Sequence, residues 1–348
     1  MQRVYRSRPN KRAPRTIFAL MKSGAKNKCS RDTRHARTRL QFRMAFADRP
    51  SFVWRLRTRP LGLGERTRLM AIVNITPDSF SGDGALHPGI PRAAGQKFAL
   101  GAAVEAHDNG ADIIDLGAES TRPSSHPLSA DEEQARLLPV LEELLHERPE
   151  AIVSVDTYHA ATARACARAG AEIVNDVSGL TWDEAMASAI ASTGCGLVLM
   201  HTRGRPQEWP TQQRLTHDEV LPTVFAGLMQ QLALAEAAGI PDEKIVADPG
   251  FGFGKRGAEN WALLAGLARL HELGRPLLAG ISRKGFLGEA VNPLHPPDLE
   301  KSDARRIASV AAGVAAILAG AHVLRVHDLQ AAREAAAVAD EILGAGEQ

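Results

Sequence analysis

Three polar residues, Asp156, Asn175 and Asp248, follow short apolar runs of the sequence and could bind one ligand together. Capping of the next helix is the ordinary role of such residues. If they are buried side by side, however, they need partners, because an unpaired buried carboxylate is very costly. A row of N–H donors would satisfy them. The aminopyrimidinone edge of pterins and guanine offers two parallel donors to one carboxylate, so these residues favour a heterocycle of that kind.

A basic group comes from the last two apolar runs, in Gly-Ile-Ser-Arg-Lys-Gly from Gly280 and in Arg-Val-His-Asp from Arg325. Arg325 and His327 alternate along one extended segment, so their side chains point to the same side. A solvated basic patch is the ordinary alternative, but it explains poorly why the charge lies at two strand ends. Helix N-termini add exposed amides at such positions. We therefore expect this group to bind phosphate.

Two polar loops accompany these groups. One follows Asn74 and contains Pro77, Gly82 and Gly84, and the other runs from Glu119 through Ser125. Either loop alone is most simply an ordinary turn, with proline fixing the exit and glycines allowing unusual backbone angles. Two such loops side by side suit a lid over a charged substrate.

The elements that must position these residues repeat along the chain. Short Ile- and Val-rich runs alternate with longer Ala- and Leu-rich stretches, which indicates parallel strands covered on both faces by helices. Eight runs follow Arg68: 69–75, 112–119, 151–157, 173–177, 196–201, 245–248, 276–282 and 322–328. The main helix candidates are 129–145, 160–169, 216–238, 258–273 and 303–318.

Eight strand and helix units predict a (β/α)₈ barrel, whose usual size is about 250 residues. An open doubly wound sheet is the alternative, but no Gly-x-Gly-x-x-Gly opens a first helix, which weakens the dinucleotide-binding form of that fold. In a barrel all eight strand ends meet at one rim, where barrel enzymes keep their chemistry. The fold therefore predicts that the scattered polar residues form one pocket.

Charge divides the chain into two unlike parts. Residues 1–43 hold 14 of the 42 Lys and Arg residues and one acid, Asp32, so residues 44–348 carry 28 basic and 39 acidic side chains. An acidic body excludes a nucleic-acid-binding domain. Arg-rich leaders occur in transit peptides and in disordered arms. We favour a disordered basic extension, or a translation start at Met44, over a targeting signal, and we assign 44–348 to the barrel.

Cysteine usage and hydropathy bear on the setting of the protein. Cys29, Cys166 and Cys195 show no paired spacing, so neither a disulfide framework nor a thiolate metal site is indicated, and a cytoplasmic setting is expected. The uncharged stretch 307–324 reaches membrane-span length. We reject a span because Ala and Gly dominate it, and because residues 319–321 have the character of a turn between a helix and a strand.

Taken together, the motifs resemble one family, the dihydropteroate synthases, over about residues 69–329. Any one motif is a weak signal, and six in family order are strong. They are Asn-Ile-Thr-Pro-Asp-Ser-Phe-Ser from Asn74, Glu-Ser-Thr-Arg-Pro from Glu119, Asn-Asp-Val-Ser-Gly from Asn175, Asp-Pro-Gly-Phe-Gly-Phe-Gly-Lys from Asp248, Ser-Arg-Lys from Ser282 and Arg-Val-His-Asp from Arg325.

The resemblance implies a reaction and a division of labour. The family joins p-aminobenzoate to 6-hydroxymethyl-7,8-dihydropterin diphosphate and releases pyrophosphate. By resemblance, catalysis would involve Asp156, Asp248, Lys284, Arg325 and His327, and the pterin would be held by Asp156, Asn175, Asp248 and Lys284. Asn74, Arg325 and His327 would bind the diphosphate, with Mg²⁺ on its oxygens and Asn74 as the protein ligand of the metal. The p-aminobenzoate site would be shaped by Thr121, Arg122, Pro123, Phe251, Phe253 and Ser282.

Two other functions stay open at this point. A pterin-binding methyltransferase barrel shares the pterin pocket, but it needs no diphosphate site. A non-catalytic pterin-binding relative would be recognised by missing basic or loop residues, and none is missing here. The resemblance also implies a homodimer, for which the Ala-rich last helices are candidate contacts.

Overall fold

The fold is described from a computed structural model, which describes residues 46–75, 92–119, 127–296 and 305–346. These residues lie in the compact unit Met44–Gln348, so the basic extension 1–43 falls outside them. The strands are β1 (Phe52–Arg55), β2 (Pro60–Leu63), β3 (Arg68–Asn74), β4 (Ile113–Gly117), β5 (Val153–Asp156), β6 (Ile173–Asp176), β7 (Gly196–Met200), β8 (Ile245–Asp248), β9 (Leu278–Ala279) and β10 (Val323–Val326). The α-helices are α1 (Arg92–Asp108), α2 (Ala130–Glu147), α3 (Ala160–Arg168), α4 (Met186–Thr193), α5 (His217–Ala237), α6 (Ala258–Ala265), α7 (Gly285–Val291), α9 (Arg306–Leu318) and α10 (Leu329–Gly346).

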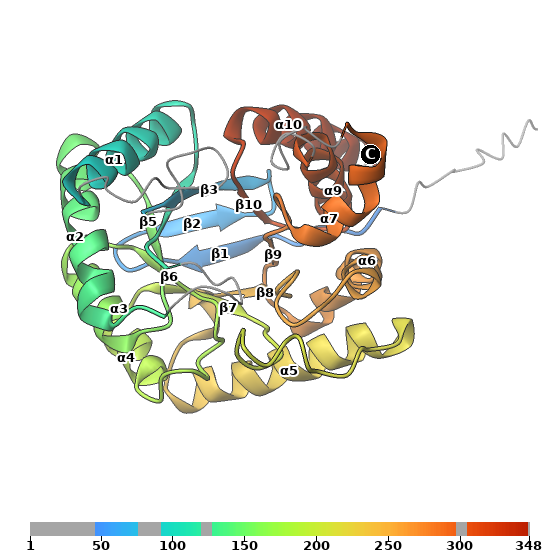
Figure 1. Ribbon diagram of the computed structural model, residues 1–348, viewed down its shortest axis with the longest axis horizontal. Coiled ribbons are helices and arrows are strands. Elements are labelled where there is room, and N and C mark those ends of the chain that lie inside the picture. Colours follow the sequence, from blue (N-terminus) through green and yellow to red (C-terminus); the bar gives the residue numbers. More distant parts are fainter. Residues whose placement is uncertain (1–45, 76–91, 120–126, 297–304, 347–348) are drawn as a thin grey trace, which may run out of the picture. The chain divides into compact units, whose positions relative to one another are not determined.

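Strands β3 to β10 form the predicted barrel. They pair in parallel in the order β8-β7-β6-β5-β4-β3-β10-β9. A parallel bridge between Ala247 and Leu277 joins the two ends of that order, and the amide of Ala247 donates to the carbonyl of Pro276 at 2.9 Å. Helices surround the ring of strands (Figure 1). The prediction of eight strands in a (β/α)₈ fold is confirmed: β8 coincides with its run, β3 is shifted by one residue, and the other strands are shorter than their runs.

The N-terminal end of the barrel is closed by a hairpin that the sequence did not reveal. Strands β1 and β2 pair antiparallel, and Trp54, Leu56, Leu61 and Leu63 are buried from this segment. They pack on a layer of side chains near the strand starts: Met70, Ile113, Ile173, Val198, Val246, Leu278 and Val323. The indole N–H of Trp54 donates to the carbonyl of Lys244 at 2.8 Å. The hairpin therefore shields this end of the barrel from solvent.

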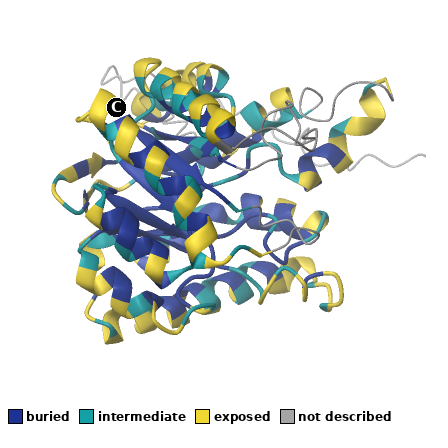
Figure 2. Ribbon diagram, turned by 60° about the vertical axis from the view of Figure 1, so that its left-hand side comes forward, coloured by how far each residue is buried: buried dark blue, intermediate teal, exposed yellow. Residues whose placement is uncertain are grey.

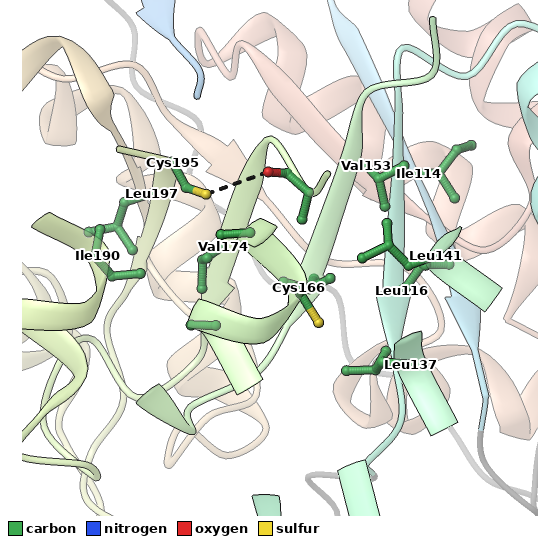
Figure 3. Close-up of a cluster of buried hydrophobic side chains, with 14 of the residues drawn as sticks. Ile114, Leu116, Leu137, Leu141, Val153, Cys166, Val174, Ile190, Cys195 and Leu197 are labelled. Carbon is green, nitrogen blue, oxygen red and sulfur yellow. Dashed lines mark hydrogen bonds between the residues drawn. The ribbon is translucent and has the colours of Figure 1, made fainter. Parts of the chain in front are cut away.

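The outer helices bury one face each against the strands and expose the other (Figure 2). A close-up of one cluster includes Leu137 and Leu141 of α2 against Ile114 and Val153 of the barrel (Figure 3). Helix α2 begins at a capping box, in which the Ser129 hydroxyl accepts from the amide of Glu132 and the Glu132 carboxylate binds back to the amide of Ser129.

The predicted helix 258–273 is wrong in one respect, because it is two elements. Helix α6 ends at Ala265, and a 3₁₀-helix, Leu267–Leu273, follows Gly266. Glycine is a poor helix former, and the chain tightens at this position.

The stretch 307–324 is not one helix. Helix α9 ends at Leu318, Gly320 turns with a φ of +91°, and β10 begins at Val323. Among the described helices, α5 is long and apolar enough to cross a membrane, judged by length and composition alone. It carries Asp218 and Glu219 in its first turn, and it buries one face on the barrel beside α6, as an outer helix does.

Candidate active site

The C-terminal rim of the barrel collects most of the predicted site residues. Asn74, Asp156 and Asp248 are the last residues of β3, β5 and β8. Asn175 and Arg325 are the last residues but one of β6 and β10. Because all eight strands run in parallel, these side chains lie at the same end of the ring. The acidic residues and the basic residue predicted from the sequence therefore lie in one site.

Arg325 lies at the centre of the site between two carboxylates. Its Nε donates to Asp115 Oδ2 at 2.6 Å, and its Nη2 donates to Asp156 Oδ2 at 2.7 Å. Burial opposes the charge of Arg325, yet Asp115 and Asp156 together raise its pKa above the ordinary value. Burial also raises the pKa of Asp156, and Arg325 opposes that rise. A guanidinium with two carboxylate partners is a strong local anchor.

Asp115 is a site residue that sequence reasoning missed. It lies in the middle of β4 and is fully buried. The side-chain amide of Asn175 donates to Asp115 Oδ2 at 3.1 Å, and Asp115 Oδ1 has no hydrogen-bond partner within the described part of the chain. One signal could have found it: a single charge inside the apolar run Ile-Ile-Asp-Leu-Gly, because a buried acid requires a partner.

Asp248 offers one carboxylate oxygen to the rim. The amide of Gly250 donates to its Oδ1 at 2.7 Å. A Cβ on Gly280 would lie 3.7 Å from its Oδ2, so the absence of a side chain at that position leaves this oxygen room. Burial raises the pKa of Asp248, and the Gly250 amide, Lys284 and Lys255 oppose the rise.

Lys284 and an apolar wall lie beside these acids. The ammonium of Lys284 lies 4.2 Å from the centre of the Phe253 ring, within cation–π range. Burial and the charge of Arg325 together lower the pKa of Lys284 to about 8, although Asp248 and Asp156 oppose this. The wall is a buried cluster from the ends of β6, β7 and β8 and their loops: Val177, Met200, Trp209 and Phe253.

His327 and Ser282 meet at the exposed edge of the same rim. His327 Nδ1 lies 3.1 Å from Ser282 Oγ, and the amide of His327 donates to the same oxygen at 3.3 Å. Asn74 ends β3, the strand next to β10, and a Cβ on Gly117 would be 3.4 Å from its Oδ1 and 3.5 Å from Asp156 Cβ. A polar atom therefore stands next to the Asp156 and Arg325 pair on this side.

The remaining predicted residues do not gather at this point. Phe251 is 1% exposed and stacks on Phe286 in the cluster between the barrel and its helices, so only Phe253 of the two phenylalanines lies beside Lys284. Thr121, Arg122 and Pro123 lie outside the described residues, as does the loop that follows Ile75.

Glu119 joins the segments on either side of residues 120–126. Its carboxylate accepts from the Tyr158 hydroxyl at 2.9 Å and from the amide of Leu128 at 3.1 Å. Tyr158 follows β5, so this carboxylate links the ends of β4 and β5 at the rim. Geometry and charge together define a barrel enzyme whose rim can bind a polar heterocycle and an anion side by side.

The comparisons with known proteins agree with that class. Residues 70–327 match the model of a family described as pterin binding enzyme. Dihydropteroate synthase of Escherichia coli K12 is 40% identical over 279 residues, which cover 80% of this chain and 93% of that protein. The Yersinia pestis dihydropteroate synthase, solved with a sulfonamide drug complex, is 37% identical with a TM-score of 0.74, covering 84% and 100% of the two chains.

A third comparison concerns a substrate-sized ligand. The Xanthomonas albilineans dihydropteroate synthase with 4-aminobenzoic acid is 38% identical with a TM-score of 0.72, covering 84% of this chain and 98% of that one. The chain belongs to the pterin-binding enzyme family and, within it, to the dihydropteroate synthases.

Proposed function

We propose that this chain condenses 6-hydroxymethyl-7,8-dihydropterin diphosphate with p-aminobenzoate to give 7,8-dihydropteroate and pyrophosphate. The observation that carries the proposal is the juxtaposition of Asp156 and Asp248 with Arg325 on one rim. The relatives add support, because they are dihydropteroate synthases and one was solved with 4-aminobenzoic acid.

The acids and the apolar wall suit the pterin. Asp248 has one oxygen occupied by the Gly250 amide, and the other can accept from the parallel N–H donors of the aminopyrimidinone edge. Asn175 lies on β6, with Met200 at the end of β7 between it and Asp248, so the flat ring would lie against an apolar surface. Lys284 would donate to the carbonyl side of the pterin. The Asp248 carboxylate would make the site specific for the pterin, because a ligand without the N–H donors would leave this buried carboxylate unpaired.

Departure of the leaving group is the harder half of the reaction. An anilinic amine is neutral near pH 7 and needs no strong base, but it is a weak nucleophile. Its nitrogen forms a bond to the pterin methylene carbon while the C–O bond breaks. The electron pair of the C–O bond leaves with pyrophosphate, and the secondary ammonium formed on the amine nitrogen loses a proton to water to give the secondary amine. Arg325 and His327 would stabilise the charge on the departing oxygens, and Asp156 the positive character at the methylene.

Mg²⁺ completes the proposal as a ligand of the diphosphate. Its preferred donors are oxygens, and it keeps several waters when substrate phosphate is bound. Asn74 Oδ1 fits such a site, since it lies at the rim near Asp156, whose carboxylate is engaged by Arg325. No cluster of three or more acidic, histidine or cysteine ligands occurs within the described ranges, which is compatible with a metal held mainly by substrate. When bound, Mg²⁺ would neutralise charge on the leaving oxygens.

The p-aminobenzoate would lie next to the pterin methylene. Phe253, which lies against the Lys284 ammonium, and Ser282, which contacts His327, are the described candidates. Thr121, Arg122 and Pro123 stay predictions from the sequence. Sulfonamides resemble p-aminobenzoate and should compete with it, as the Yersinia pestis relative with a sulfonamide drug suggests.

The assembly and its setting are further parts of the proposal. The large apolar side chains of Trp261 on α6 and Ile307 on α9 are 41% and 75% exposed, which supports a contact with a second copy. Sedimentation would test the homodimer, and Ile307→Glu should shift it towards monomer. A cytoplasmic location is supported by the two described cysteines, Cys166 and Cys195, which are both free.

The decisive experiment is incubation of the purified protein with the pterin diphosphate, p-aminobenzoate and Mg²⁺, followed by mass detection of the product. Omission of each component in turn is the control. Absence of dihydropteroate in the complete mixture would overturn the proposed function. A parallel incubation with a methylated folate and a corrinoid protein tests methyl transfer, a reaction that needs no diphosphate site at Arg325 and His327.

A further inference from the structure

Lys255 is buried beneath the candidate site and has no role in the reaction as proposed. Its side chain is among the most buried charges of the described chain, because the residue is 2% exposed. Its Nζ donates to the carbonyls of Gly250 at 2.8 Å, Phe253 at 3.1 Å and His201 at 3.3 Å. Three acceptors match the three N–H donors of an ammonium. A lysine bonded in this way holds main chain in place and has no donor left for a ligand.

The carbonyls that Lys255 binds belong mainly to the loop after β8, which coils around the ammonium. Gly250 and Gly252 have φ angles of +68° and +81°, which favour glycine. A Cβ on Gly250 would overlap the carbonyl oxygen of His201, so the loop passes directly against the end of β7. Asn260 of α6 closes the coil, donating to the carbonyl of Lys255 at 2.9 Å and accepting from the amide of Gly252 at 2.7 Å.

The same loop orients two groups of the site. The amide of Gly250 holds Asp248 Oδ1, which decides which carboxylate oxygen faces the rim. Phe253 packs on the Lys284 ammonium, and a Cβ on Gly252 would lie 3.3 Å from Lys284 Cδ. If the loop shifts, the hydrogen bond to Asp248 and the packing surface of Lys284 therefore shift together.

The positive charge of the Lys255 ammonium also acts on Asp248. Burial lowers the pKa of Lys255 to about 7, and Asp248 opposes this. Burial raises the pKa of Asp248, and the charge of Lys255 is one of the effects that oppose the rise. The charge therefore helps to keep Asp248 ionised. Other charged groups act on this pair: Lys284, Arg203 and Glu259 on Lys255, and Lys284 and Arg325 on Asp248.

We infer that Lys255 is a positioning residue for pterin binding: by holding the loop 250–255 and by its charge, it sets Asp248 and Lys284 to receive the pterin without touching it. This role rests on the proposed function, because it assumes that the rim binds the pterin diphosphate. It adds a residue outside the pocket to the groups that determine affinity for that substrate.

Lys244 provides a matched control. Its ammonium also donates to main-chain carbonyls, those of Leu56 at 3.2 Å and of Gly194, but at the N-terminal end of the barrel. Lys244→Met therefore removes a similar lysine far from the rim. Both lysine variants should lower the melting temperature, and only Lys255→Met should change the site.

The experiment compares Lys255→Met, Lys244→Met and the unaltered chain. Calorimetry measures pterin diphosphate binding at pH 7 and pH 8.5, hydrogen exchange follows the segment 249–255, and product formation is measured in parallel. We expect Lys255→Met to weaken pterin binding about 100-fold at pH 7, the scale of an ångström-sized misplacement. The loss should be smaller at pH 8.5, because Lys255 of the unaltered chain, whose pKa burial lowers to about 7, has itself lost its charge there. Exchange of the segment should be faster.

The inference is overturned if Lys255→Met binds the pterin diphosphate as tightly as Lys244→Met does. The part of the inference that rests on the charge of Lys255 is overturned if the loss is equal at both pH values, since loss of the loop contacts alone would give that result. Should Lys255→Met not fold, Asn260→Ala opens the same coil and must itself weaken pterin binding for the inference to stand. Absence of product from the unaltered chain would reject the proposed function instead, and the binding comparison would still judge Lys255.

Discussion

The two ends of the barrel bury polar groups in different ways. At the N-terminal end, Glu172 accepts from the amide of Thr58 at 2.8 Å, and both ring nitrogens of His322 have main-chain partners. At the C-terminal rim, Asp115 keeps an oxygen with no partner in the described chain, and Asp248 Oδ2 lies beside Gly280, which has no side chain to cover it. Buried polar groups are normally satisfied. Glu172 and His322 are thus satisfied within the chain, whereas the two rim carboxylates leave oxygens for a ligand.

A change at the N-terminal end should therefore act on stability alone. Trp54 is 1% exposed and fills the mouth of the barrel below the first layer of strand side chains. We expect Trp54→Ala to lower the free energy of unfolding by about 3–5 kcal/mol, the usual cost of a large buried aromatic. Denaturant unfolding measures this. The Michaelis constants for the pterin diphosphate and for p-aminobenzoate should be unchanged at temperatures where the variant is folded. A large rise in either constant would mean that the two ends of the barrel are coupled.

A change at the rim should act mainly on turnover. Arg325→Ala removes the cation next to the departing diphosphate and leaves Asp115 and Asp156 without their shared partner. We expect kcat/KM to fall about 10²–10³-fold, the scale found when one transition-state donor is removed. Arg306→Ala is the control, because Arg306 is 62% exposed and forms a longer ion pair with Asp328. Equal kinetics for the two arginine variants would refute the leaving-group role.

A subtler change at the rim tests recognition of the heterocycle. Asp248→Asn keeps the shape of the side chain but replaces an acceptor by a donor that faces ligand donors. We expect pterin affinity to fall by about 1–3 kcal/mol, the cost of an unsatisfied buried group. Calorimetry measures it, with the exposed Asp242→Asn at the other end as control. Near-normal pterin binding by Asp248→Asn would show that Asp248 does not bind the pterin.

Most of the barrel could be predicted from the sequence, because buried parallel strands are continuous apolar runs that differ plainly from their helices. The hairpin at 52–63 could not. Its strands have four residues each and alternate between exposed and buried positions, with Val53 57% exposed, so no apolar run marks them. Their partner is the floor of the barrel, which exists only after the ring has closed.

The candidate site was predictable where a polar residue ends a run, as at Asp156 and Asp248. It was not predictable at Asp115, which lies inside a run, where a charge is compatible only with a partner from distant Arg325. Nor could the sequence show which of Phe251 and Phe253 lies at the candidate site. They lie in a loop of alternating glycines with positive φ, and neither strand nor helix periodicity applies there.

The smallest expected effect concerns the N-terminal end of the barrel and how the free energy of unfolding depends on pH there. His322 is fully buried, its Nδ1 accepts from the amide of Leu277 at 3.0 Å, and its Nε2 donates to the carbonyl of Pro50 at 2.8 Å, so the ring is neutral. Burial lowers its pKa to about 4 from the ordinary 6.5. Above pH 6.5 the ring is neutral in the folded and unfolded states alike. Between pH 6.5 and 4 only the unfolded chain takes up the proton, so stability falls by about 1 kcal/mol per pH unit. The slope of unfolding free energy against pH should be smaller by that amount in His322→Gln, whose amide can replace both bonds, and equal slopes would show that this end is not closed to protons.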